Sequence, residues 1–268
     1  MNSRKDIVTV LFIGDVVGKA GLDALTKWLP ELKARHEIEF TIVNGENGAQ
    51  GKGLTEALAK QYMELGADVI TGGNHTWTHA EFRRYLDQSD RVLRPANYPD
   101  SAPGKGAVVL TSSAGTPIGV INLQGRAFMY DIDCPFRKAD ELIDRLRRQT
   151  PILIVDMHAE ATAEKSALAW YLDGRVSAVI GTHTHVQTAD ERILPKGTAY
   201  LSDAGMTGPH DSVIGLDVQV AVKRFLSGIP EYYQTATANV RLNGVLIKID
   251  RQTGRAKSIE RINLPEGK

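Results

Sequence analysis

The chain has 268 residues, 42% of them hydrophobic, which is enough for one sizeable core. Its 32 basic residues balance its 32 acidic residues, so no net positive charge points to duplex nucleic acid or an anionic membrane as a partner. Cys134 is the only cysteine, which excludes a disulfide framework and a thiolate metal cluster and fits a reducing compartment.

The N-terminal segment has some features of a signal peptide, because Arg4 and Lys5 precede an apolar run at residues 7–13. That run is only about seven residues long, and no small-residue cleavage site follows it. No later segment reaches the roughly 18 apolar residues of a membrane helix. We therefore interpret the run as the buried first strand of a cytoplasmic protein.

The first half of the chain repeats one pattern, in which a short β-branched run precedes a glycine-containing turn and an amphipathic segment. The runs lie at residues 8–13, 40–43 and 68–71, and the amphipathic segments at 19–34, 55–65 and 78–86. Apolar residues recur in the amphipathic segments at spacings of three and four, as in a helix packed on a core. The pattern predicts a βαβαβ unit.

The second half mixes this alternation with hairpins. Residues 107–111 and 117–123 are predicted to form an antiparallel pair, because only a short Ser-Ser-Ala-Gly turn separates them. Further expected elements are strands at 152–155 and 176–180, helices at 164–171 and 214–225, and strands at 239–242 and 245–249. Asn243-Gly244 predicts a hairpin turn between the last two strands, and a second turn near Thr253-Gly254 adds another strand.

No change in composition and no linker divides the chain, so residues 1–268 are predicted to form a single domain. Buried parallel strands combined with late hairpins favour an α/β fold with two mixed sheets packed face to face. With helices on both outer faces, the expected architecture is a four-layer α/β/β/α sandwich.

Residues able to bind metal ions follow the predicted buried strands. They are Asp15, Glu46, Asn47, Asn74, His75, His158, His183 and His185. Because the carboxyl ends of parallel strands line one crevice, five separate segments deliver these side chains to the same place. Four of the seven histidines lie at these strand ends, which ordinary structural roles do not explain.

Taken singly, most of these residues have ordinary explanations. Asp15 could cap a helix, Asn74 could form a turn, and His158 could be a hydrogen-bonded core histidine. His183 and His185 are more specific, because residues two apart on an extended chain point the same way, about 6.6 Å apart. That spacing suits two neighbouring metal ions.

The order of these motifs resembles the calcineurin-like metallophosphoesterase superfamily. The motifs are Gly14-Asp15, Glu46-Asn47, Gly73-Asn74-His75, the lone His158, and Gly181-x-His183-x-His185. More closely, the chain resembles the YmdB-like branch along its whole length. The matching segments are 11–21, 44–54, 72–77, 158–165, 181–190 and 205–215.

The sequence departs from the wider superfamily at three positions. Val17 stands where the usual Asp-x-His motif has a histidine ligand, and Glu46 replaces the usual bridging aspartate. In the YmdB-like branch, the asparagine after that glutamate supplies the missing ligand, which is Asn47 here. Thr76 stands where many relatives have a carboxylate that orients the preceding histidine, so the orientation of His75 stays open.

The resemblance implies a dinuclear metal site. Asp15, Glu46, Asn47 and His185 would surround one metal ion, and Glu46 would bridge to a second ion that Asn74, His158 and His183 complete. Two ions about 3.5–4 Å apart can clamp phosphoryl oxygens and lower the pKa of a bridging water for in-line attack. The ligand types suit iron, manganese or zinc, and the resemblance favours iron.

The implied function is hydrolysis of small phosphodiesters, 2′,3′-cyclic nucleotides in particular, with His75 as the general acid. The alternative is a metal-containing regulatory or scaffold protein with weak or vestigial phosphodiesterase activity. A nucleotide-dependent dehydrogenase or kinase is disfavoured, because Gly14, Gly18 and Gly21 match neither the dinucleotide fingerprint nor a P-loop.

A few other residues are weaker candidates for the site. Arg126, Phe128 and Tyr130 could form a pocket rim, although an ordinary loop role is favoured, and the same holds for His79 and His210. The base of the substrate and the formation of a homo-oligomer stay open.

Overall fold

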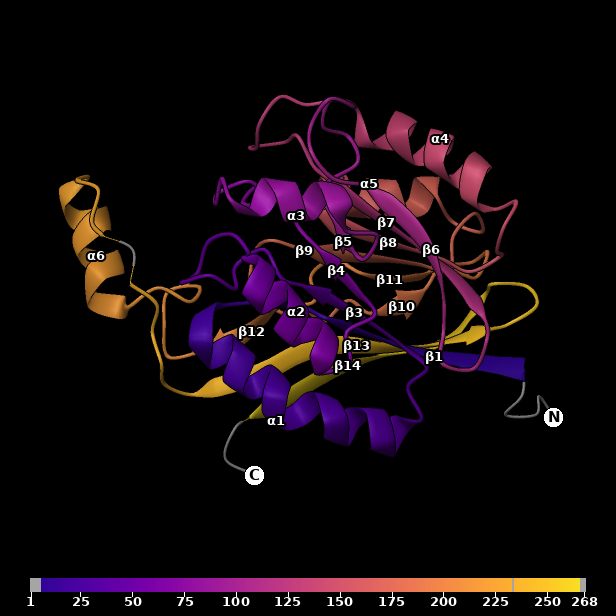
Figure 1. Ribbon diagram of the computed structural model, residues 1–268, viewed down its shortest axis with the longest axis horizontal. Helices are drawn as coiled ribbons and strands as arrows, with labels where there is room; N and C mark the ends of the chain where they lie inside the picture. The colour runs from indigo at the N-terminus through magenta and orange to yellow at the C-terminus, as the bar shows by residue number, and fades with distance from the viewer. Residues whose placement is uncertain (1–5, 233, 266–268) are drawn as a thin grey trace.

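The computed structural model describes residues 6–232 and 234–265 (Figure 1). Within these residues, eight strands form a first sheet in the order β2-β12-β13-β1-β3-β4-β5, with β14 paired to β13. Their bounds are β1 Ile7–Ile13, β2 Asp15–Val16, β3 Phe40–Asn44, β4 Val69–Thr71, β5 Val92–Leu93, β12 Met206–Pro209, β13 Val240–Asp250 and β14 Ala256–Pro265. The sheet is mixed, because β1, β3, β4 and β5 are parallel and β13 is antiparallel to β1.

The second sheet has the order β10-β11-β9-β8-β7-β6. Its strands are β6 Ala107–Thr111, β7 Pro117–Gln124, β8 Leu153–His158, β9 Ala178–Thr182, β10 Arg192–Ile193 and β11 Ala199–Leu201. The expected antiparallel pairing of β6 with β7 is confirmed, and β7, β8, β9 and β11 are parallel.

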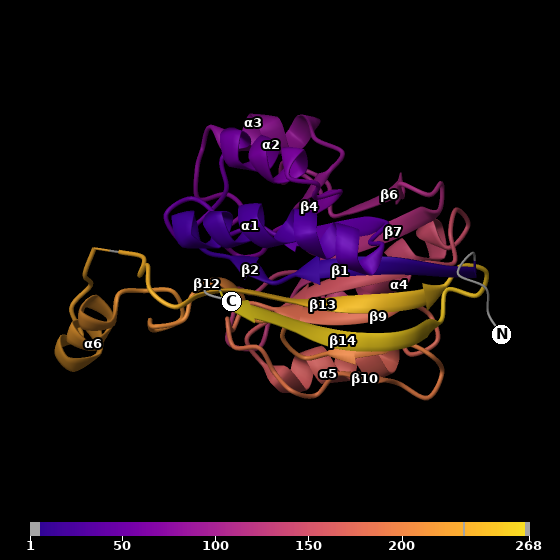
Figure 2. The ribbon, with the colours of Figure 1, turned by 90° about the horizontal axis from the view of Figure 1, so that it is seen from below.

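Helices α1 to α5 lie on the outer faces of the two sheets, and α6 projects away from them (Figures 1 and 2). The helix bounds are α1 Gly18–His36, α2 Glu56–Glu64, α3 Phe82–Gln88, α4 Pro135–Leu146, α5 Thr162–Tyr171 and α6 Val218–Ser227. Figure 1 shows α1 at the bottom of the molecule and α4 at the top, with the sheets between them. None of the helices in the described part of the chain combines the length and the apolar character that a membrane span requires.

Side-chain alternation along the strands creates three apolar layers. On β1, Val10 and Phe12 face the second sheet and pack with Ile154, whereas Leu11 faces α1 and packs with Leu29. Successive residues of a strand point to opposite faces, so one strand contributes to both cores. A third core lies between the second sheet and helices α4 and α5. The expected four-layer α/β/β/α sandwich is confirmed.

The hairpin turn expected at Asn243-Gly244 is wrong, because both residues lie inside the long strand β13. Gly244 pairs with Ile13 on one side and with Ile262 on the other. A Cβ atom on Gly244 would lie 2.4 Å from the Phe12 carbonyl oxygen. The glycine therefore permits a close approach of two strands, and the real turn before β14 lies near Thr253-Gly254 as expected.

Two helix boundaries also differ from expectation. The helix expected at 214–225 begins at Val218, because the Asp217 side chain accepts hydrogen bonds from the amides of Gln219 and Val220 and caps it. The helix expected at 78–86 is α3, which begins at Phe82 after a series of turns. Helix α4 was not expected. Figures 1 and 2 show α6 standing apart from the layered body.

We predict that Gly244→Ala lowers the free energy of unfolding by about 1–3 kcal/mol, because the added methyl overpacks the contact between β13 and β1. Urea denaturation measures the change. Gly115→Asn is the control, since a Cβ at Gly115 meets nothing within 4 Å, so its cost is limited to the left-handed backbone at φ 83°, which asparagine adopts more readily than most residues. Equal stability of Gly244→Ala and the native protein would contradict the close-approach explanation.

Candidate metal centre

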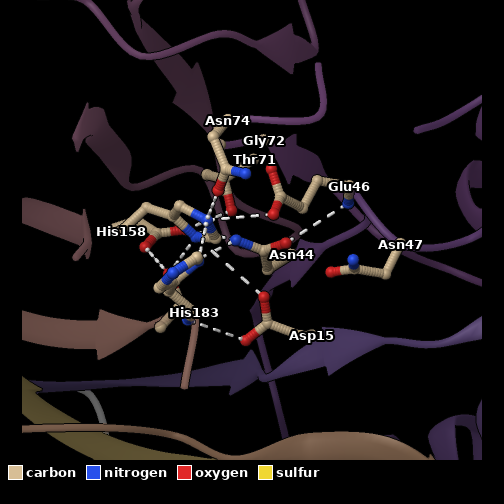
Figure 3. Close-up of polar contacts among 12 residues, drawn as sticks. Asp15, Asn44, Glu46, Asn47, Thr71, Gly72, Asn74, His158 and His183 are labelled. Carbon is tan, nitrogen blue, oxygen red and sulfur yellow. Dashed lines mark hydrogen bonds and ion pairs between the residues drawn. The ribbon is translucent and has the colours of Figure 1, made fainter. Parts of the chain in front are cut away.

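The candidate ligands come from both sheets and meet at the carboxyl ends of their parallel strands. Asp15 follows β1, Glu46 lies just after β3, and Asn74 lies after β4 in the first sheet. His158 ends β8 and His183 follows β9 in the second sheet. Figure 3 shows these five side chains directed toward a common centre.

Three ligand atoms of this group converge on the Nε2 atom of His158. Glu46 Oε1 lies 2.9 Å from it, and Asn74 Oδ1 and His183 Nδ1 each lie 3.0 Å from it. The ligand atoms of Glu46, His158 and His183 all lie within 4.8 Å of one another. A single ring proton cannot satisfy three acceptors, so this arrangement fits a cation better than a hydrogen-bond network.

A second group of ligand atoms lies beside the first. Asp15 is fully buried, and its Oδ1 atom lies 4.0 Å from Nε2 of His185. Among the described residues, neither this oxygen nor the buried Oδ1 of Asn47 accepts a hydrogen bond. The Asn47 amide nitrogen donates to the Gly51 carbonyl oxygen at 3.0 Å, which leaves Oδ1 free to bind a metal ion. Unpaired buried oxygens of this kind are the donors expected at a metal site.

Each histidine of the cluster uses its other ring nitrogen elsewhere. Nδ1 of His158 lies 2.9 Å from Thr182 Oγ1, and Nδ1 of His185 lies 2.8 Å from the Ile214 carbonyl oxygen. Nε2 of His183 lies 3.2 Å from Glu160 Oε2. Partners of this type orient metal-binding histidines and select their tautomers.

Asp156 lies beneath His158 and completes its support. Thr182 Oγ1 donates to Asp156 Oδ1 at 2.7 Å, while Asn44 and Thr71 donate to Oδ2 at 3.2 and 2.5 Å. The supporting role of Asp156 and Asn44 was not predicted from the sequence. The available signal was spacing, because residues 156 and 158 share one face of a strand.

Glycine at position 73 gives the chain room to cross the cluster. A Cβ atom there would lie 2.3 Å from Nε2 of His158 and 2.4 Å from Oε2 of Glu46. Any other residue at this position would therefore occupy the space between ligand atoms.

Charge coupling within the cluster is strong. Burial raises the pKa of Glu46, but attraction to His158 and a hydrogen bond from it prevail and lower that pKa to about 2. Burial lowers the pKa of His158, but Glu46 overcomes this effect and raises the pKa to about 9. Burial and the neighbouring His158 lower the pKa of His183 to about 3. Without metal, the proton on His158 balances the carboxylate.

His75 lies at the border of the cluster. Its backbone amide donates to Glu46 Oε2 at 3.0 Å, and its Nε2 atom lies 3.4 Å from the side-chain nitrogen of Asn74. The Thr76 hydroxyl donates to the Gly73 carbonyl oxygen and accepts from the Gly73 amide, so it does not orient the His75 ring. The polar contact of that ring comes instead from the amide of Asn74.

Val17 is fully buried. Its side chain is buried against the segment that contains Gly208 and Gly215, where a Cβ at Gly215 would lie 2.9 Å from Val17 Cγ1. The position that carries a ligand in the wider superfamily is thus part of the packing here.

The weaker sequence candidates do not join the ligand cluster. His79 contacts the Lys52 carbonyl oxygen at 3.1 Å, and His210 contacts the Met206 carbonyl oxygen at 3.2 Å. Phe128 and Tyr130 lie in a loop after β7 and are 92% and 68% exposed. The Glu164 carboxylate holds the start of this loop by accepting the amide of Arg126.

Comparisons with known proteins identify one matching family and several similar proteins. The family model described as YmdB-like protein matches residues 11–262. A 2′,3′-cyclic-nucleotide 2′-phosphodiesterase of Bacillus subtilis is 52% identical over 253 residues, covering 94% of this chain and 96% of that protein. A putative phosphatase/phosphodiesterase of Mycoplasma genitalium is 38% identical, covering 97% of this chain and 94% of that protein.

Two solved structures share the fold. A hypothetical protein from Thermus thermophilus superposes with a TM-score of 0.91 at 42% identity, covering 97% of this chain and all of that one. A structure described as a novel phosphatase from Mycoplasma pneumoniae superposes with a TM-score of 0.90 at 36% identity, covering 97% of this chain and 94% of that one.

We predict that metal uptake by the metal-free protein releases a proton from His158, since its pKa of about 9 keeps the ring protonated near neutral pH. Titration with Mn(II) near pH 7.5, in two buffers of different ionisation enthalpy, should give different heats. The proton release should decline as the pH rises through about 9. Identical heats in both buffers would contradict the proposed protonation of the cluster.

Proposed function

The chain belongs to the YmdB-like family, and from this membership we propose that it is a metal-dependent phosphodiesterase acting on 2′,3′-cyclic nucleotides. The observation that carries the proposal is the convergence of Glu46, Asn74 and His183 on Nε2 of His158. The similar Bacillus subtilis phosphodiesterase supports the substrate class.

We assign the ligands in two groups that share Glu46. One group adds Asp15, Asn47 and His185, and the other adds Asn74, His158 and His183. Two bound dications would supply positive charge for the phosphate and a water of lowered pKa. Iron is favoured as the native metal, and manganese and zinc suit the same ligands.

The chain's own residues complete the reaction. Thr182 and Ile214 orient the histidines, so that the nitrogens facing the cluster keep their lone pairs. His75, on the border of the cluster, would donate a proton to the leaving alkoxide. Burial lowers the pKa of His75, and a docked phosphate would favour its protonated form by placing negative charge beside the ring.

The second candidate is a metal-containing regulatory or scaffold protein with weak phosphodiesterase activity. It needs the same fold and the same ligands, so only turnover separates the two candidates.

We predict that the purified protein binds about two transition-metal ions per chain and hydrolyses phosphodiesters when loaded with iron or manganese. Glu46→Gln removes the shared carboxylate charge and should lower turnover by more than about 100-fold. Loss of a residue that only orients a metal ligand typically costs about 10–100-fold, and loss of the ligand itself should cost more. Elemental analysis and steady-state kinetics measure both effects. Metal binding without turnover by the native protein would favour the regulatory candidate, and one ion with full activity would exclude the two-metal mechanism.

We also predict that the leaving group decides the effect of His75→Ala. A ribose alkoxide needs a proton as the P–O bond breaks, whereas nitrophenolate leaves without one. The variant should therefore lose about 10²–10⁴-fold in rate with a 2′,3′-cyclic nucleotide and far less with bis-nitrophenyl phosphate.

The control variant for this experiment is His183→Ala, which should lose metal as well as rate, whereas His75→Ala should retain its metal. Equal rate losses of His75→Ala on both substrates would show that His75 positions the phosphate and does not donate a proton.

A further inference from the structure

We propose that Lys165 and Asp203 are positioning residues that fix the turn carrying His183 and His185. The inference rests on the proposed function, because it concerns the residues through which a metal would be held. It assigns a role to a buried ion pair that the hydrolytic chemistry itself does not use.

Lys165 and Asp203 form an ion pair that is almost completely removed from solvent. Lys165 lies on α5, and its Nζ atom donates to Asp203 Oδ2 at 2.7 Å. Each residue is 1% exposed. Attraction to Lys165 and its hydrogen bond lower the pKa of Asp203 against the opposing effect of burial. Because burying two charges is costly and stabilises a fold little, a pair in this position calls for another explanation.

Asp203 also accepts hydrogen bonds from the turn at residues 183–185 and from Gly205. Its Oδ2 atom accepts from the Thr184 amide at 3.1 Å and from the Thr184 hydroxyl at 2.8 Å. Its Oδ1 atom accepts from the Gly205 amide at 2.8 Å. Thr184 lies between the two proposed histidine ligands. The Asp203 carboxylate, which is held by Lys165, therefore binds the middle of the turn.

The turn needs such support because its backbone is unusual. His183 has φ 100° and His185 has φ 66°, a region that residues with a Cβ atom rarely adopt. Strained conformations of this kind persist only where the surrounding structure enforces them. On the other side, the His185 carbonyl oxygen accepts from the Met206 amide at 3.2 Å.

Space for the lysine is built into the neighbouring strand. A Cβ atom on Gly181 would lie 2.8 Å from Lys165 Cδ, so the side chain passes over a glycine at the end of β9. One ion pair thus acts on both histidines, and through them on both proposed ligand groups. Loss of the ion pair between Lys165 and Asp203 should therefore weaken metal binding by both proposed ligand groups.

The experiment separates stability from positioning with three variants. Lys165→Met leaves a buried carboxylate unpaired and should lower Tm strongly. Lys165→Met combined with Asp203→Asn removes both charges and should recover most of the Tm. Asparagine has a single acceptor oxygen, so the double variant loses the hydrogen bonds to Thr184 or the one to Gly205, and it should still lose about 10–100-fold in Mn(II) affinity. Thr184→Val removes the hydroxyl alone and should weaken Mn(II) binding with little change in Tm.

A second readout needs no metal. In the metal-free double variant, hydrogen exchange at residues 183–188 should be faster than in the native protein. The matched control replaces a remote ion pair, in which Arg251 lies 2.6 Å from Glu39, by Arg251→Met with Glu39→Gln. That control should leave both Mn(II) affinity and exchange at 183–188 unchanged.

The outcomes are distinguishable. A double variant that recovers native Mn(II) affinity and native exchange along with its Tm would overturn the positioning role. A native protein that binds no Mn(II), but whose exchange at 183–188 still responds to the double variant, would overturn the proposed function and leave the turn assignment standing. Unchanged exchange in the double variant would overturn the assignment whatever the metal result.

Discussion

The two sheets are joined near the carboxyl ends of their parallel strands by a buried polar contact centred on Asp156. Asp156 of the second sheet accepts hydrogen bonds from Asn44 and Thr71 of the first sheet, and from Thr182 beside it. Leaving such a carboxyl group unsatisfied in the interior would be costly, so the contact fixes how the sheets meet at their carboxyl ends. Asp156 is fully buried, and this burial raises its pKa to about 7. The contact joins the ends of β3, β4, β8 and β9, at or after which several candidate ligands lie.

The proposed metal site would explain how a chain without net charge binds a phosphate. The 32 acidic and 32 basic residues balance overall, but the cluster gathers ligand atoms that are mostly neutral imidazoles and amides. Only Asp15 and Glu46 contribute carboxylates to the proposed ligand set. A pair of dications there would keep a local positive surplus, and field strength near the site matters more for a small phosphate than the total charge of the protein.

Much of this arrangement could be predicted from local sequence. Asp15 and Glu46 follow β-branched runs, and that position alone places them at the edge where parallel strands end. The failures have physical causes. Asn243-Gly244 has the composition of a hairpin turn, but the glycine serves the close approach of β13 to Phe12, which depends on a strand more than 200 residues away in the chain. The support of His158 by Thr182 likewise arises only when β8 pairs with β9, and no local pattern encodes it.

The packing of Val17 links its position to the segment at residues 206–215. Its buried side chain leaves little room for a side chain at Gly208 or Gly215, because a Cβ at these glycines would lie 3.2 Å from Val17 Cβ and 2.9 Å from Val17 Cγ1, respectively. Because Val17, Gly208 and Gly215 share one contact, the energetic effects of substitutions at these three positions should be coupled.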